Sequence, residues 1–471
     1  MIETVEARSR LLKRELGLGD LVLTQILFIV GLPWVGVAAK QGPAHVVFWL
    51  MAMVLFYLPS AAVVIHLNRL MPLEGGLYQW AKLGFNELTG FLVAWNLWLF
   101  AILNTSDVGL QVTQYVVYIA GPGAERFTGR RWFVIAMSVA VMAGLVTITV
   151  IGLGVGKWLH RAGGVMMLAT FGALVALPWL NLAHGSLASF HPLTATAPVM
   201  SMMSVNLLAK MGFGAFGGFE YVAIHAGETR NPVRSVAWSV VIAAPVIVVM
   251  FILGTSSVLA LIPFDRIDLI APIPQVLSAG FRPLGAMAIV APLTILALLG
   301  IRVAQASVMF TGNTRLPMVA GWDGLLPEWF TRVHDRYRTP VNSILFVGAA
   351  TLALSVAGLI GVGQQEAFQL LWNASATFYA LTYLVMFALP LVGMRGREPA
   401  PLWLRGCALS GFLMTALFVA VSIVPIVQVE SRLLFAAKLS GLILVTNAIG
   451  VAVYLGKAGR AGRAGAAGGL G

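Results

Sequence analysis

Long apolar stretches alternate along the chain with short polar connections. A run of about 20 apolar residues can cross the hydrocarbon core of a bilayer as one helix. Twelve such runs occur, at residues 21–39, 44–67, 89–119, 132–152, 163–180, 202–226, 236–261, 284–312, 341–361, 366–392, 402–427 and 433–456. None shows the ten-residue alternation of a membrane β-barrel. We therefore expect an all-α polytopic membrane protein of about 12 transmembrane helices, with loops too short for a soluble catalytic domain.

Composition agrees with this pattern. The chain is 59% hydrophobic and 10% charged, whereas soluble domains are about 45–50% apolar and about 25% charged. The net charge of +12 could serve nucleic-acid binding or membrane topology. Because the basic residues lie in short loops between apolar runs, topology is favoured and no nucleic-acid partner is expected. The single cysteine, Cys407, excludes an intramolecular disulfide. We expect no cofactor, no metal and no disulfide-linked subunit, and a monomer or homodimer.

The distribution of Lys and Arg predicts the orientation. Twenty of them flank the spans on the side of the N-terminus and eight on the other side, with Lys210 and Arg302 inside spans. The positive-inside rule then puts both termini in the cytoplasm, with the chain in the cell (inner or plasma) membrane. We expect a cytoplasmic segment at 1–20, a transporter core at 21–392, two further helices at 402–456 and a disordered cytoplasmic tail at 457–471.

Two spans contain helix-breaking sequences. Span 1 reads Gly31-Leu32-Pro33-Trp34-Val35-Gly36, and span 6 carries Gly212, Gly214, Gly217 and Gly218 within seven residues. Proline removes a backbone donor and glycine relaxes the backbone. Paired breaks five spans apart, in halves 21–180 and 202–392, point to a central binding site at which helix ends offer N–H and C=O groups. The alternative is that the glycines only allow close helix packing.

The candidate substrate-binding residues follow from these breaks. An aromatic face there could hold an ammonium group, although most aromatic residues in a membrane chain serve packing. The candidates in the breaks are Gly31, Leu32, Pro33, Trp34, Gly36, Phe213, Gly214, Phe216, Gly217 and Gly218.

Three of the charged residues within the predicted spans stand out, since a charge at mid-membrane costs at least about 2.5–3.5 kcal/mol. Asp107 could bind a substrate ammonium or carry a coupled proton, or it could pair with Arg302. Glu220 could be a proton-titrating coupler or could cap a half-helix. Arg302 must pair with Asp107, with Glu220 or with an anionic substrate group. At the end of span 6, Glu228 is expected to form a gate or structural pair with Arg230 and Arg234.

Several motifs in order along the chain carry a family resemblance. Gly75-Gly76-Leu77-Tyr78-Gln79-Trp80 follows span 2, Gly218-Phe219-Glu220 and Glu228-Thr229-Arg230-Asn231-Pro232 end span 6, and Asp323-Gly324-Leu325-Leu326-Pro327 follows span 8. The chain resembles the amino acid–polyamine–organocation permease superfamily. The resemblance implies a five-plus-five inverted repeat with broken helices 1 and 6, plus two extra C-terminal helices.

Two departures from the family pattern bear on function. Leu32 and Pro33 stand where many members have a turn that receives the substrate carboxylate, and proline cannot donate a hydrogen bond. The middle of span 5, around Val165-Met166-Met167, lacks the lysine that many members carry in place of a sodium ion. The coupling chemistry of those members therefore cannot be carried over to this chain.

The predicted function is a secondary transporter, not an enzyme, that carries amino acids or related amines by alternating access. Its driving force would be a proton or substrate exchange, because titratable carboxylates lie within the spans. Two alternatives stay open. A polyamine or cationic-amine carrier is favoured by Asp107 and disfavoured by Arg302, and a non-transporting sensor or membrane enzyme belongs to a different class.

Overall fold

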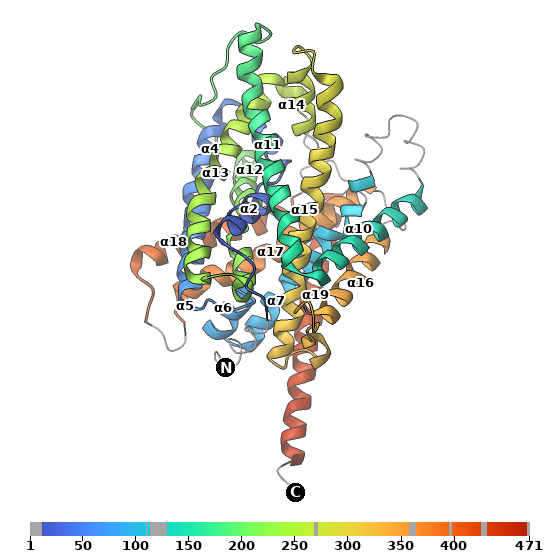
Figure 1. Cartoon of the computed structure of the whole chain (residues 1–471). Helices are drawn as coiled ribbons and strands as arrows, with labels where there is room; N and C mark the ends of the chain where they lie inside the picture. The colour runs from blue at the N-terminus through green and yellow to red at the C-terminus, as the bar shows by residue number, and fades with distance from the viewer. Residues whose placement is uncertain are drawn as a thin grey trace.

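The computed structural model describes residues 12–109, 111–113, 130–267, 272–357, 364–394, 398–424 and 431–468. Within these ranges the chain is helical, and its one β pairing is an isolated bridge between Leu16 and Thr229. Ten helical segments are long and apolar enough to cross a membrane. Together they form an elongated bundle, with the end of the C-terminal helix projecting beyond it (Figure 1). The predicted all-α polytopic membrane protein is confirmed.

Each of the twelve predicted spans contains helix. The first span is interrupted and forms two short helices, α2 (Leu18–Ile29) and α3 (Trp34–Ala39). The ninth span forms α16 (Val341–Ala357). The sixth is also interrupted, between η4 and η5, and the others are continuous helices or short helices joined end to end. They comprise η1 (Gly42–Ala44), α4 (His45–Ala52), η2 (Met53–Tyr57), α5 (Leu58–Leu70), α7 (Glu87–Ser106), α10 (Arg131–Ile151), α11 (Leu153–His184), α12 (Met202–Ala209), η4 (Lys210–Ala215), η5 (Phe219–Glu228), α13 (Pro232–Leu261), α15 (Met287–Trp322), α17 (Gln364–Val392), α18 (Leu402–Ser422) and α19 (Arg432–Gly468).

Short helices lie between the spans. These are α6 (Leu77–Gly84), η6 (Phe264–Arg266), α14 (Pro272–Phe281) and η7 (Glu328–Thr331). In Figure 1, α6 lies at the lower end of the bundle, from which α19 projects, and α14 lies near the opposite end.

Two boundaries differ from the sequence prediction. Span 8 was expected to end at residue 312, but α15 continues to Trp322 and encloses Arg315, whose side chain is fully buried. The polar composition of this stretch is typical of a loop, yet its side chains form hydrogen bonds inside the bundle. Helix α19 continues to Gly468, so helix replaces the expected disordered tail over most of 457–468, in keeping with the high helix propensity of its alanines.

The predicted break in span 1 is present. Helix α2 ends at Ile29, Val30 is extended, and α3 begins at Trp34. Pro33 has no amide hydrogen to continue the helix. The interruption leaves carbonyl groups without helical partners, and the side-chain amide of Gln305 in α15 donates to the carbonyls of Leu27 (2.9 Å) and Val30 (3.3 Å).

The predicted break in span 6 is present as well, and the two breaks touch. After α12 and the π-helical η4, Gly218 takes φ +139°, a conformation that favours glycine, and η5 then begins. A Cβ at Gly218 would lie 2.7 Å from the Phe28 ring and 2.8 Å from Ile29. Close approach of the two interrupted helices therefore requires glycine at this position.

Candidate functional site

The indole of Trp34 fills the space between the two breaks. It is 8% exposed, and a Cβ at Gly31 or at Gly214 would lie 2.5 Å from its atoms. Its ring centroid is 5.7 Å from that of Trp372 in α17. Next to it, Leu32 is half-buried and Pro33 is exposed, while Gly36 is buried in α3. Of the span-1 candidates, Gly31 and Trp34 thus lie where the two breaks meet, and the Trp34 indole occupies that place.

The candidate aromatic residues of span 6 belong to the packed core. Phe213 lies edge-on to Tyr379 and Tyr383, with centroids 5.7 and 5.2 Å away. Phe216 stacks on Tyr57 at 4.3 Å. Beside them, a Cβ at Gly217 would lie 2.8 Å from the carbonyl oxygen of Phe213 and 3.6 Å from the Tyr379 ring.

Glu220 is fully buried between two tyrosines of α17. Its carboxylate accepts hydrogen bonds from the hydroxyls of Tyr379 and Tyr383. The Tyr383 oxygen also accepts from the backbone N–H of Gly218 at 2.6 Å. Glu220 is therefore tied to the break of span 6 through hydroxyl groups, and among the described residues its side-chain partners are these tyrosines and not Arg302. Sequence reasoning missed the tyrosines, although buried hydroxyls four residues apart in an apolar helix need a partner.

Asp107 and Arg302 form an ion pair, one of the alternatives that the sequence left open. Arg302 Nη2 lies 3.1 Å from Asp107 Oδ1, and each side chain is 19% exposed. The other Asp107 oxygen accepts from the side-chain amide of Gln111. The Nε–H of Arg302 is buried and has no hydrogen-bond partner among the described residues.

Glu228 pairs with an arginine that the sequence assigned to a loop. Arg315 donates from Nε and Nη2 to the two carboxylate oxygens of Glu228, both at 2.9 Å, and from Nη1 to the Thr311 carbonyl and the Thr314 hydroxyl. The expected partners Arg230 and Arg234 are exposed instead. The prediction of a pair was right for Glu228 but wrong in its partner, because α15 extends further than its apolar run.

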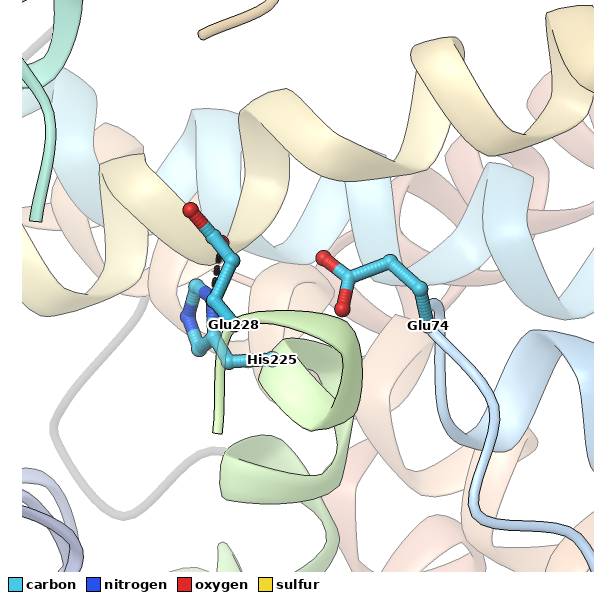
Figure 2. A group of neighbouring side chains, drawn as sticks. All are labelled: Glu74, His225 and Glu228. Atoms are coloured by element: carbon cyan, nitrogen blue, oxygen red, sulfur yellow. Dashed lines mark hydrogen bonds and ion pairs between the residues drawn. The ribbon is translucent and has the colours of Figure 1, made fainter. Parts of the chain in front are cut away.

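Glu74 and His225 complete a buried cluster with Glu228 (Figure 2). One ligand atom from each lies within 4.8 Å of the other two, as a cation site would require. However, Arg315 already engages both Glu228 oxygens, so a positive charge occupies the place of a metal. Glu74 accepts a hydrogen bond from the Gly227 N–H at 2.6 Å, and its other oxygen has no hydrogen-bond partner in the described ranges. We interpret the cluster as a hydrogen-bonded ion-pair network.

Further contacts join the helices at the end of the bundle where Glu228 lies. Asp323 accepts from Lys82 (2.8 Å) and Tyr78 (2.5 Å). The segment that precedes α2 is held by backbone hydrogen bonds of Leu16 to Glu228 and Arg230 and by side-chain ion pairs. The residues concerned are Glu15, Asp20, Glu74, Tyr78, Lys82, Lys157, Arg161, His225, Glu228, Arg315 and Asp323, and we call them the closing network.

Glu74→Gln is expected to retain the fold and to flatten the pH dependence of stability. Burial raises the pKa of Glu74 well above its usual range, and the negative charge of Glu228 raises it further. Between the unfolded and folded pKa values the folded chain binds the extra proton, so wild-type stability falls as pH rises through this window, by up to about 1.4 kcal/mol per pH unit. Glutamine can still accept from Gly227 without a titrating proton. Thermal unfolding in detergent from pH 5 to 8 measures the slope, and equal slopes for the two proteins would contradict the prediction.

The fold and site define a class: a polytopic helical membrane protein organised around two interrupted helices that meet beside intramembrane charges. A family model for amino acid permeases matches residues 17–446, so the chain belongs to the amino acid permease family. It is 24% identical to an uncharacterised transporter of Legionella pneumophila over 80% of each chain. It is 26% identical to the branched-chain amino acid permease BcaP of Bacillus subtilis, over 76% of this chain and 80% of that one.

A third relative is named for another substrate, methylthioribose. The chain is 24% identical to the methylthioribose transporter of Bacillus subtilis over 77% of its own length and 79% of the relative's. Family membership places the chain among transporters rather than enzymes, and it fits the predicted resemblance.

Proposed function

We propose that this protein is a secondary transporter that carries amino acids across the cell membrane by alternating access. The contact between the two broken helices carries the proposal: Gly214 packs on Trp34, and Gly218 on Phe28 and Ile29. Broken helices of this kind let one part of a transporter bundle move against the rest around a site at mid-membrane. Amino acids are favoured as substrates by the family and by the BcaP relative.

We assign the closing network to the cytoplasmic side, where the excess of basic residues puts the N-terminus. In this arrangement the conformation described here is closed toward the cytoplasm. Release of substrate on that side requires the ion pairs of Glu228 with Arg315 and of Lys82 with Asp323 to separate, together with the backbone contacts of Leu16.

Glu220 is the residue that we assign to proton coupling. It is the buried carboxylate bonded to the break of span 6 through Tyr383. Protonation of the carboxylate would change its hydrogen bonds with the two tyrosine hydroxyls of α17. The contact between α17 and the break of span 6 would change as a result.

The test is uptake into proteoliposomes of each of the twenty amino acids, with methylthioribose and putrescine for comparison. Wild-type protein is expected to accumulate one or more amino acids when the outside is acidic. Glu220→Gln is expected to abolish accumulation driven by the pH gradient and to retain exchange of internal for external substrate, because glutamine cannot carry the proton. Uptake of methylthioribose or putrescine alone would overturn the proposed substrate class, and unchanged accumulation by the variant would remove Glu220 from coupling.

A further inference from the structure

Helix α15 carries two membrane-embedded arginines whose hydrogen bonding differs sharply. Arg315 is fully buried, and all three of its nitrogens donate to Glu228, Thr311 or Thr314. Arg302 is partly exposed and forms an ion pair from Nη2 to Asp107, while its buried Nε–H has no partner within the described part of the chain. A guanidinium has five N–H donors in a planar fork that suits a carboxylate. Arg315 makes four hydrogen bonds within the protein, whereas Arg302 retains unused donors.

The Asp107–Arg302 pair lies beside the broken helix of span 1. Gln305, one turn along α15 from Arg302, reaches the carbonyls of Leu27 and Val30 at the break, and residues three apart share a helix face. Asp107 lies two turns from Phe100 on α7, also on a shared face. Phe100 stacks on Tyr379, the partner of Glu220, at 4.1 Å. Both charges therefore stand on helix faces that look toward the two breaks.

The break itself has few free groups for a substrate. Pro33 has no N–H to give, Gln305 already occupies the carbonyls of Leu27 and Val30, and Trp34 fills the space between Gly31 and Gly214. A carboxylate and an ammonium arriving together need an anion-binding and a cation-binding group that are close to each other. Asp107 and Arg302 meet this requirement with charges 3.1 Å apart.

We propose that Asp107 and Arg302 bind the zwitterionic head group common to free α-amino acids, with the substrate carboxylate on the Arg302 guanidinium and the substrate ammonium on Asp107. This inference rests on the proposed function, which it deepens by assigning the head-group site. Without substrate the two residues neutralise each other. When the zwitterion enters, Asp107 and Arg302 release each other and bind its ammonium and its carboxylate. Each of the two residues therefore keeps an opposite charge beside it, and the cost of an isolated charge in the membrane is avoided.

The test compares wild-type protein with the double variant Asp107→Asn, Arg302→Gln in proteoliposomes. The probe is L-leucine or, if another of the twenty amino acids is taken up better, that amino acid. Two analogues compete with it: the amide, which lacks the carboxylate, and the α-keto acid, which lacks the ammonium. For wild-type protein each analogue is expected to compete at least about tenfold more weakly than the amino acid. The double variant is expected to raise KM at least about tenfold, since a desolvated charge pair is lost at the binding site, and to discriminate less between the three compounds.

The double variant removes both charges together, so it leaves neither one unpaired. Asp265→Asn, Arg266→Gln is the matched control, because it removes the same two charges from side chains that are 78% exposed. Should the double variant not fold, Arg302→Lys keeps the positive charge without the Nε–H and is expected to raise KM in folded protein. Unchanged KM and unchanged discrimination in a folded variant would overturn the inference alone. Wild-type protein that takes up none of the twenty amino acids would overturn the proposed function and the inference together.

Discussion

Arg315→Met is expected to leave little folded protein. The side chain is fully buried and holds both carboxylate oxygens of Glu228, which is itself 4% exposed. Methionine is long and apolar but cannot donate, so Glu228 would keep only its contact with His225 and would lose the arginine that neutralises it inside the bundle. Breaking a buried pair in this way costs about 3–5 kcal/mol, a large part of the roughly 5–15 kcal/mol that stabilises a typical fold. The measurement is the yield of monodisperse protein in size-exclusion chromatography, followed by its melting temperature.

The double variant Glu228→Gln, Arg315→Met separates the effect of the lost arginine from that of the stranded carboxylate. It removes both charges, so it is expected to recover much of the yield that the single variant loses. Arg332→Met serves as the control for loss of an arginine, because Arg332 is exposed. If the single variant were as stable as wild-type protein, Glu228 would take up a proton or reach water once Arg315 is lost, and the expected cost of a stranded charge would be wrong. If single and double variants were equally unstable, the loss would lie in the Thr311 and Thr314 contacts.

The helical membrane fold and its breaks could be predicted because each depends on local sequence. Lipid imposes a long apolar run on every span, and these runs are continuous along the chain. Pro33 and the glycines around Gly218 interrupt a helix through their own backbone properties, whatever packs against them. The Asp107–Arg302 pair could be named as an alternative for a similar reason, since few charged residues stand within the apolar runs and a buried charge needs a partner.

The partners of Glu220 and Glu228 could not be predicted, because they are set by tertiary packing. Glu220 lies 159 and 163 residues from the tyrosines that bind it, and tyrosines in an apolar helix read as ordinary core residues. The threonines and asparagine around Arg315 end the apolar run, so the sequence predicts a loop there. Inside the bundle those polar groups bond to one another and to neighbouring helices, so the helix continues. Hydropathy reports contact with lipid, and it cannot identify polar residues that face other helices.

Gly218→Ala is expected to destabilise the protein and to stop uptake, although it adds one methyl group. Gly218 has φ +139°, which strains any residue with a Cβ by about 1–3 kcal/mol. The added Cβ would also lie 2.7 Å from Phe28 and 2.8 Å from Ile29, and such overpacking costs about 1–3 kcal/mol more. Relief of these contacts would push the two broken helices apart and weaken the Gly218–Tyr383 hydrogen bond that ties the break to α17. Melting temperature in detergent and uptake in proteoliposomes measure the two effects.

Gly172→Ala is the matched control for this substitution. Gly172 lies within α11, and a Cβ there would meet no atom within 4 Å. Alanine should be neutral at Gly172 or stabilise the helix by up to about 1 kcal/mol, since glycine is the poorer helix former. The contrast between the two variants isolates the contact of the breaks from the general effect of replacing glycine. A Gly218→Ala protein with wild-type melting temperature and uptake would mean that the two broken helices do not need to approach this closely. The contact that carries the proposed function would then lose its support.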